Sequence, residues 1–279
     1  MISGTFFKHH CRYRIGDYTN ERYFQPVFKE DESIDNNFVF IKTELIDFFA
    51  RILKNNRDLI PMRYSLVLHN SDINFDTSIV RNIFNHFTDI NFLYTQNLLC
   101  SHPFAYPLPI GLPNPKWSHG NLDRIKKVIN QPINKTNDVY VDFNISTNQK
   151  ERLYCLSKVG HNAQTKYPNS ANISDHNMFV NETHEVYLQN IKSSYFTVSP
   201  DGNGKDCHKT WEALYMGSIP IVTDSYFARK FKEYGIPLLI IKDWSEYKKL
   251  QLDEDTYNTM WNNFDISQLN NIGFWFRYD

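Results

Sequence analysis

Long apolar runs and paired cysteines are both missing from this sequence. No uncharged apolar run reaches the length that spans a bilayer, and the first residues are broken by His, Lys and Arg where a signal peptide would be apolar. The cysteines are scattered without a CxxC pair, which favours free thiols in a reducing compartment. They are Cys11, Cys100, Cys155 and Cys207. We therefore expect a soluble, cytoplasmic protein without a membrane span.

The common signatures of nucleotide and metal chemistry are also absent. The sequence has no P-loop, no GxGxxG turn, no GxSxG elbow and no HExxH. The Asp-x-Asp spacing from Asp253 to Asp255 falls in a charged region, which indicates a solvated helix face. We therefore expect no metal site, and neither a P-loop kinase nor a nicotinamide-dependent epimerase is favoured.

The composition is that of a folded protein without a strong charge. The 279 residues are 41% hydrophobic and 15% aromatic, so disorder is not expected. A formal net charge of −1 argues against binding nucleic acid by bulk electrostatics. The length allows two domains, which we place at residues 1–135 and 136–262, followed by a tail at 263–279 that packs back across both.

Strand and helix patterns alternate in the first domain, which predicts half of a doubly wound α/β domain. Strands are expected at 38–41, 63–69 and 91–95, and helices at 43–53, with Thr43 as cap, and at 77–87. Residues 1–36 lack a clear period and are expected to be irregular, with one short helix.

The second domain follows a proline-punctuated segment, a basic helix at 122–129 and a polar linker at 131–138. We expect its strands at 139–145, 195–198, 219–222 and 236–241. Helices are expected from 149, at 186–191, 206–216 and 225–234, and after Asp243, with a surface loop at 162–181.

The stretch from Tyr195 to Asp224 carries the clearest functional pattern. Gly202 and Gly204 follow a strand and let the backbone approach a ligand closely. The helix that follows, with Asp206 as cap and Gly217 as stop, offers free N–H groups to an anion such as diphosphate. Ligands of parallel sheets bind at the carboxyl ends of the strands, where this loop falls.

On this helix His208 and Glu212 share a polar face, and Trp211, Leu214 and Tyr215 share an aromatic face. The polar face can meet a ligand while the aromatic face packs in the core. Alternatively, His208 and Glu212 are a solvated pair and the glycines merely turn the chain. Spacing alone gives both interpretations equal support.

Three further positions have both a functional and a structural interpretation. Thr147 and Arg152, at a strand end and a helix start, can clamp a diphosphate, but Arg152 can also be an exposed, salt-bridged side chain. Asp72, just past a strand, can act as general base or can cap a turn. His69 is a second candidate base, or a packed histidine at the strand end. Trp117 and His119 can bind a sugar or form a rigid packing loop.

The segment SPDGNGKDCHKTWEALYMGSIPIV, residues 199–222, resembles the donor-site signature of exostosin-like inverting glycosyltransferases, S-P-x-G-N-G-x-D-x-H-[RK]-x-W-E-A-L. Residues 144–152, and residues 107–112 followed by 117–120, are similar to further segments of that family. In its length and in its lack of an anchor, the sequence is most similar to the short members of that family from chlorella viruses, among them a β-xylosyltransferase. A viral source would place the protein in the host cytoplasm.

The resemblance implies two Rossmann-like domains that face each other across a cleft (GT-B type) and an inverting, metal-independent transfer from a UDP-sugar, with UDP-xylose favoured. The acceptor would be a hydroxyl of an oligosaccharide or glycoprotein glycan, and Asp72 the general base. Arg152 and the helix amides would offset the charge of the leaving diphosphate, and Glu212 would accept ribose hydroxyls. The implied donor-binding residues are Thr147, Arg152, Ser199, Asn203, Gly204, Asp206, His208, Thr210 and Glu212. The alternative is a catalytically inactive, lectin-like protein on the same fold.

Overall fold

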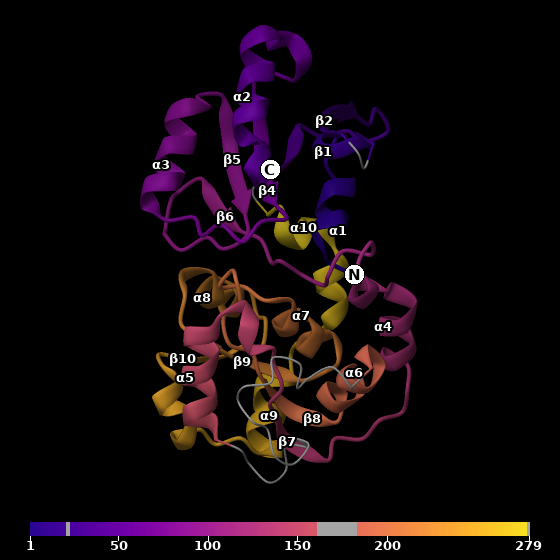
Figure 1. Ribbon diagram of the computed structural model, residues 1–279, viewed down its shortest axis with the longest axis vertical. Helices are drawn as coiled ribbons and strands as arrows, with labels where there is room; N and C mark the ends of the chain where they lie inside the picture. The colour runs from indigo at the N-terminus through magenta and orange to yellow at the C-terminus, as the bar shows by residue number, and fades with distance from the viewer. Residues whose placement is uncertain (21–22, 161–182, 278–279) are drawn as a thin grey trace. The chain divides into compact units, whose positions relative to one another are not determined.

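A computed structural model describes residues 1–20, 23–160 and 183–277. Contacts between Cα atoms divide the chain into two compact units, each with its own sheet (Figure 1). Unit 1 comprises residues 1–110 and 267–279, and unit 2 comprises residues 111–266. The mixed α/β class is as expected, whereas the arrangement of two domains across a cleft stays a prediction.

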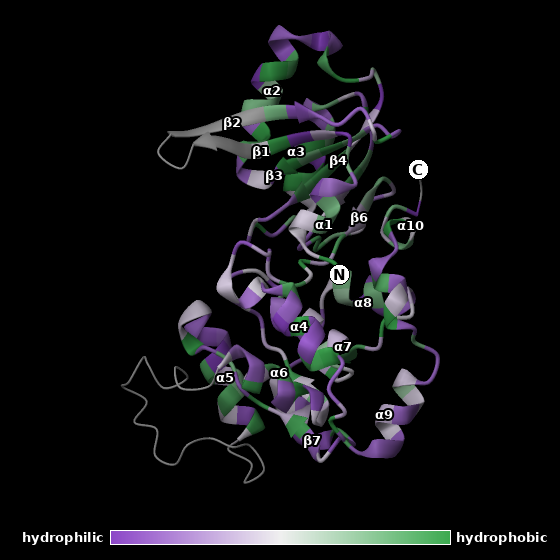
Figure 2. Ribbon diagram, turned by 90° about the vertical axis from the view of Figure 1, so that its right-hand side faces the viewer, coloured by the Kyte–Doolittle hydropathy of each residue, from purple (hydrophilic) through white to green (hydrophobic). Residues whose placement is uncertain are grey.

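Unit 1 is built on a six-stranded sheet with the order β2-β1-β3-β4-β5-β6. Its strands are β1 Tyr13–Asn20, β2 Tyr23–Glu30, β3 Phe38–Lys42, β4 Tyr64–His69, β5 Ile90–Thr95 and β6 Ala105–Pro107. All neighbours pair in parallel except β1 and β2, which are antiparallel. Strand β4 is buried along its whole length, as expected for a parallel strand that is covered on both faces. In Figure 2 the region around β3 and β4 is coloured mainly green, for hydrophobic, whereas the edge strand β2 is paler.

The helices of unit 1 follow from amphipathic spacing and from their caps. They are α1 Gly4–His9, α2 Ile46–Asn55, α3 Thr77–His86 and α10 Ile272–Trp275, with 3-10 turns η1 Thr43–Leu45 and η2 Arg57–Leu59. Helix α2 buries Phe49 and Leu53, and the side chain of Asp76 caps α3 by accepting from the N–H of Ile79 at 2.9 Å. The strands expected at 38–41, 63–69 and 91–95 and the helix at 77–87 are confirmed to within two residues.

Two predictions for unit 1 were wrong. Residues 1–36 contain the β1–β2 hairpin and not only a short helix. Strand β2 contains Pro26 and lies at the edge of the sheet, where a missing N–H is tolerated. Thr43 does not cap α2, because it begins the turn η1 and its hydroxyl donates to the carbonyl of His69 at 3.5 Å.

The C-terminal tail packs within unit 1. The ring of Phe276 stacks on that of Phe38, with centroids 4.2 Å apart, and lies 4.9 Å from that of Tyr94. Trp275 is buried, and its Nε1 donates to the carbonyl of Leu269 at 2.9 Å. Packing of the tail across both domains stays a prediction.

Unit 2 contains a parallel four-stranded sheet with the order β10-β9-β8-β7. Its strands are β7 Asn137–Tyr140, β8 Ser194–Val198, β9 Ile219–Thr223 and β10 Leu239–Ile241. Its helices are α4 Leu122–Ile129, α5 Gln149–Val159, α6 His184–Lys192, α7 His208–Tyr215, α8 Tyr226–Glu233 and α9 Glu254–Trp261. The 3-10 turns are η3 Ser118–Gly120, η4 Ile145–Thr147, η5 Trp244–Lys249 and η6 Ile266–Asn270, the last at the boundary between the units.

The predicted strand–loop–helix–strand unit is confirmed as β8, α7 and β9. The two strands pair in parallel, with Phe196 opposite Ile219. Gly217 and Gly235, at φ +72° and +87°, end α7 and α8, since positive φ is readily adopted only by glycine. Apolar side chains of these strands form the core of unit 2 together with Trp244 of η5.

Two strands of unit 2 differ from their predicted form. The strand expected at 139–145 lies at Asn137–Tyr140, because the side chain of Asn144 accepts from the N–H of Ser146 and starts the turn η4. The strand expected at 236–241 begins only at Leu239, since the N–H of Ile236 bonds back to the carbonyl of Phe231. Asp243 caps the helix that follows, as expected, by accepting from the N–H of Ser245 at 2.8 Å, and this helix is the 3-10 helix η5.

The boundary expected near residue 135 lies inside unit 2. Residues 111–135 belong there because α4 packs on α6, where the Nζ of Lys192 donates to the carbonyls of Val128 and Gln131 at 3.0 and 2.7 Å. The surface loop expected at 162–181 lies outside the described residues. Within the described ranges, no helix is long and apolar enough to cross a membrane.

Candidate functional site

The glycine loop, residues 201–204, lies between the carboxyl end of β8 and the start of α7, and side chains hold it on several sides. The N–H of Gly202 donates to the carbonyl of Gly204 at 3.0 Å, which closes the turn. The carboxylate of Asp201 accepts from the hydroxyl of Thr223 at 3.0 Å and from the Nζ of Lys205 at 2.8 Å. The loop therefore has a fixed shape, and it lies at the carboxyl ends of the strands, where parallel sheets bind ligands.

Arg152 of α5 is buried against this loop. Its Nε donates to the carbonyl of Asp201 at 3.0 Å, and its Nη1 donates to the carbonyl of Asn144. From the start of α5, the side-chain amide of Asn148 donates to the carbonyl of Gly202 at 2.9 Å. The alternative of an exposed Arg152 is therefore wrong, and the structure brings residues 144–152 and the glycine loop together as one assembly.

Gly202 allows this close packing. A Cβ atom at this position would lie 3.1 Å from the Nη2 of Arg152 and 3.2 Å from the Sγ of Cys207. Both neighbours are buried, so neither can move away easily. Burial raises the pKa of Cys207 to about 12, which keeps its thiol protonated. The glycine thus allows a close approach and does more than turn the chain.

Asp206 does not cap α7 as expected. Its carboxylate is buried, and both oxygens accept from the indole Nε1 of Trp211, at 2.9 and 3.1 Å. Cys207 occupies the N-cap position and gives no side-chain hydrogen bond to the helix. Asp206 therefore stabilises α7 by its hydrogen bonds with Trp211, a buried residue of that helix.

The remaining predicted donor residues lie around the same loop. The hydroxyls of Ser199 and Thr210 are 2.9 Å apart and link the end of β8 to α7. Asn203 is exposed at the tip of the glycine loop. Thr147 is exposed in η4, where its hydroxyl donates to the carbonyl of Asn144 at 3.2 Å. Segments distant in sequence thus meet at one end of the sheet.

Glu212 and His208 do not form a solvated pair. Glu212 is only 5% exposed, and its Oε2 accepts from the hydroxyl of Tyr187 at 2.8 Å. Its Oε1 accepts from the Nε2 of His184 at 3.3 Å. His208 instead donates from Nδ1 to the carbonyl of Gly111 at 2.7 Å, since a carbonyl can only accept. In the neutral ring this leaves Nε2 of His208 as an acceptor.

Glu212, His184, Tyr187 and Lys209 form what we call the carboxylate cluster. The Nζ of Lys209 donates to the hydroxyl of Tyr187 at 2.8 Å. Burial alone would raise the pKa of Glu212, but the hydrogen bond from His184, the charge of Lys209 and the hydrogen bond from Tyr187 outweigh it and lower the pKa. Burial lowers the pKa of Lys209, and burial together with Glu212 raises that of Tyr187. Glu212 is therefore a buried, ionised carboxylate at neutral pH.

This electrostatic arrangement makes stability depend on pH. Because the pKa of Glu212 is lower in the folded state, its contribution is complete above the ordinary value of 4.5 and is lost as pH falls below it. Glu212→Gln should cost about 2 kcal/mol at pH 7, and the difference from wild type should shrink on acidification. Urea denaturation at several pH values measures this. Exposed Glu233→Gln serves as control, and a difference that does not vary with pH would contradict the assignment.

His184 and Tyr187 of α6 are members of the cluster that sequence reasoning missed. They lie one turn apart on a helix that was expected at 186–191 without a functional role, and the available signal was this spacing on one helix face. His119 lies beside them, with its ring centroid 6.4 Å from that of His184. Burial lowers the pKa of His119. Trp117 is 53% exposed and carries the Nζ of Lys116 over its ring at 5.1 Å.

In unit 1, Asp72 follows the carboxyl end of β4 and is exposed. The turn is formed by its neighbours, because Asn70 adopts φ +60° and the hydroxyl of Ser71 accepts from the N–H of Ile73 at 3.2 Å. Within the described part of the chain, no side-chain hydrogen bond engages Asp72. Ser71, and not Asp72, is therefore the residue whose side chain caps this turn.

His69, the second candidate base, is a packed residue. It is fully buried, its Nε2 donates to the carbonyl of Pro109 at 2.9 Å, and its Nδ1 accepts from the N–H of Asn70 at 2.8 Å. With both ring nitrogens engaged, it has no free position from which to take a proton.

Metal-ligating side chains do not gather in the described part of the chain, where no group of three or more His, Cys, Asp or Glu residues could hold an ion. Asp253 accepts from the N–H of Thr256 at 2.9 Å and caps α9, with Glu254 and Asp255 exposed in its first turn. The interpretation of this acidic segment as a solvated helix face is confirmed.

Residues 144–276 are similar to the RXYLT1 C-terminal domain family. The match covers slightly less than half of the 279 residues. It begins at Asn144 and contains Arg152, the glycine loop and the helix with Glu212, whereas Asp72 lies outside it. No curated protein sequence matches the chain. The match indicates a xylosyltransferase-like glycosyltransferase, and so supports the glycosyltransferase interpretation of the sequence.

Proposed function

We propose that this protein transfers xylose from UDP-xylose to a hydroxyl of an oligosaccharide or glycoprotein glycan, with inversion and without a metal ion. The observation that carries the proposal is the buried assembly of Arg152, Asn148 and the glycine loop at the carboxyl end of β8. This assembly lies entirely in the segment that is similar to the RXYLT1 C-terminal domain. A polar backbone loop of fixed shape before a helix start is suited to a diphosphate.

The donor residues take distinct roles in this proposal. Amides of residues 203 and 204 and of the start of α7 hold the diphosphate, with Asn203 at the open tip of the loop. Arg152 supplies positive charge beneath the loop and fixes its shape through the carbonyls of Asp201 and Asn144. Glu212 accepts hydrogen bonds from the ribose hydroxyls. This is possible because a carboxylate has about four acceptor positions, and His184 and Tyr187 use only two of them.

The reaction we propose is a single displacement. The acceptor oxygen forms a bond to the anomeric carbon while the bond from that carbon to the diphosphate oxygen breaks, and the electron pair leaves with UDP. Asp72 takes the proton of the attacking hydroxyl, which suits an exposed carboxylate without a competing side-chain hydrogen bond. Helix amides and Arg152 stabilise the charge on the leaving diphosphate in place of a metal ion.

A second candidate is a lectin-like protein without turnover. The exposed ring of Trp117 supports it, since an aromatic face can stack on a sugar. This alternative predicts binding of a glycan without any stabilisation by a nucleotide.

A panel of UDP- and GDP-sugars tests the proposal by thermal shift and by slow donor hydrolysis, with EDTA present throughout. UDP should stabilise the protein, by about 2.7 kcal/mol at a concentration 100 times its Kd, and GDP should not. UDP-xylose should be hydrolysed despite EDTA. Failure of every nucleotide to shift the melting temperature would overturn the donor site and favour the lectin-like protein. Loss of hydrolysis with EDTA and its return with Mn²⁺ would overturn metal independence alone.

A further inference from the structure

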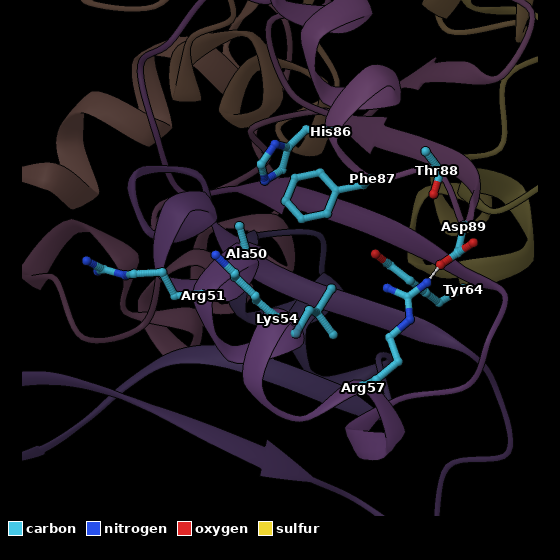
Figure 3. A pocket seen from close by; sticks show the side chains of 10 residues that line it. Ala50, Arg51, Lys54, Arg57, Tyr64, His86, Phe87, Thr88 and Asp89 are labelled. Atoms are coloured by element: carbon cyan, nitrogen blue, oxygen red, sulfur yellow. Dashed lines mark ion pairs between the residues drawn. The ribbon is translucent and has the colours of Figure 1, made fainter.

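A pocket of about 460 Å³ lies in unit 1, away from the carboxyl strand ends that carry Asp72. It opens between the last turns of α2 and α3 and the amino ends of β4 and β5 (Figure 3). The amino ends of the strands lie at the opposite end of the sheet from the carboxyl ends, where Asp72 lies. All its lining residues belong to unit 1, whereas the proposed donor residues belong to unit 2.

The inner wall of the pocket is apolar and aromatic. Leu53 and Phe87 are each 6% exposed, and Tyr64 is 2% exposed. The ring of Phe49 holds Tyr64 edge-on, with centroids 6.0 Å apart. Such a wall can pack against the ring of a ligand, as the apolar walls of small-molecule sites do.

The hydroxyl of Tyr64 is a polar group at this apolar wall. Burial raises the pKa of Tyr64, so the hydroxyl stays protonated and can donate. No hydrogen bond engages it among the described residues. A hydroxyl of a largely buried tyrosine ordinarily finds a partner, and a bound ligand would supply one here.

The rim of the pocket is cationic. The lining includes the cations Arg51, Lys54 and Arg57 and one carboxylate, Asp89, which pairs with Arg57. In the described ranges Arg51 and Lys54 have no carboxylate partner. Figure 3 shows Arg57 directed to Asp89, whereas the side chains of Lys54 and Arg51 are drawn on the other side of the view from Asp89. Ammonium and guanidinium groups together match the oxygens of a phosphate.

Compensation of the helix dipoles explains only part of this arrangement. Lys54 and His86 lie in the last turns of α2 and α3, where cations are favoured without any ligand. That effect does not explain the space, the apolar wall or the unengaged hydroxyl of Tyr64. These three features fit an occupant with a ring and a hydrogen-bond acceptor, and the cations of the rim fit a negative charge on it.

We propose that this pocket binds a phosphate monoester carried on a ring, as in a sugar phosphate or a nucleoside monophosphate. The volume is within the range of small-molecule sites and larger than an inorganic phosphate needs. Lys54 and Arg51 bind the phosphate, Phe87 and Leu53 pack against the ring, and the hydroxyl of Tyr64 donates to a ring substituent. The site is independent of the proposed glycosyl transfer.

Isothermal titration calorimetry with ribose 5-phosphate, ribose and inorganic phosphate tests the site. Titration with UMP shows whether a nucleoside monophosphate binds more tightly than a sugar phosphate. Ribose 5-phosphate should bind more tightly than either fragment. Lys54→Ala should weaken its binding about tenfold or more, as expected for a lost charge-assisted contact. Tyr64→Phe keeps the ring and should weaken binding several-fold, and exposed Lys248→Ala is the matched control. UMP titrated into wild type and Lys54→Ala separates binding in this pocket from binding at the donor site.

Absence of ribose 5-phosphate binding at millimolar concentration would overturn the proposal. Binding that neither Lys54→Ala nor Tyr64→Phe weakens would also overturn it, because the ligand would then lie elsewhere. Equal affinity for inorganic phosphate and ribose 5-phosphate would show that the apolar wall takes no part, which contradicts the ring-binding role. Circular dichroism of both variants shows whether the fold is intact.

Discussion

Replacing Arg152 with alanine is expected to destabilise unit 2 by about 3 kcal/mol, because buried acceptors lose a charged donor. Its guanidinium holds the carbonyl of Asp201 in the glycine loop and the carbonyl of Asn144 at the start of η4. The loop should lose its shape, and stabilisation by UDP should disappear with it. Urea denaturation measures the first effect, and thermal shift with UDP measures the second.

Two further variants separate the causes of this loss. Arg152→Lys keeps the charge but cannot reach both carbonyls with a planar fork, so it should recover little of the stability. Arg229 is 53% exposed and pairs with Asp224, so Arg229→Ala should cost at most about 1 kcal/mol. If Arg152→Ala were as stable as Arg229→Ala, Arg152 would not hold the loop. If it unfolded more easily but kept UDP binding, the loop would not be the donor site.

Asp72→Asn is expected to lower the turnover of UDP-xylose hydrolysis and of transfer by about 10²–10⁴-fold, the usual contribution of a general base. The fold should be unaffected, within about 0.5 kcal/mol, because Asp72 is exposed and no side-chain hydrogen bond engages it in the described part of the chain. UDP binding should also be unchanged. Steady-state kinetics with wild type and variant at equal concentration measure the effect.

Asp58→Asn provides the matched control, since Asp58 is another exposed aspartate of unit 1. It should leave turnover, stability and UDP binding as in wild type. Unchanged hydrolysis in Asp72→Asn would remove Asp72 as the base. Because His69 is buried with both ring nitrogens engaged, the search would then move to other exposed groups.

The local elements around the glycine loop could be predicted from the sequence because their signals are local. Short β-prone runs gave β8 and β9, and Gly217 marked the end of α7 through a backbone conformation that glycine adopts readily. The apolar spacing on α7 identified Trp211 and Leu214 as core residues, and both are fully buried. The donor-site signature pointed to the segment that matches the RXYLT1 C-terminal domain.

Predictions failed where a side chain had several possible partners. Asp206 is a good helix cap by residue type, but the indole of Trp211 competes for its carboxylate. Thr43 meets a carbonyl from the next strand and so leaves the cap of α2. Strands β1 and β2 were missed because residues 1–36 lack a clear apolar period, and β1 also pairs in parallel with β3, a non-local contact.

The sequence by itself determined the α/β class, most strands and helices, and the glycine loop, since each follows from the conformational preferences and apolar spacing of neighbouring residues. Only the tertiary structure decided what the polar side chains do. It placed Arg152 beneath the loop, paired Glu212 with His184 and Tyr187, and engaged both nitrogens of His69. The physical reason is that a buried polar group must find a hydrogen-bond partner, and that partner is brought near by the fold from a distant part of the chain.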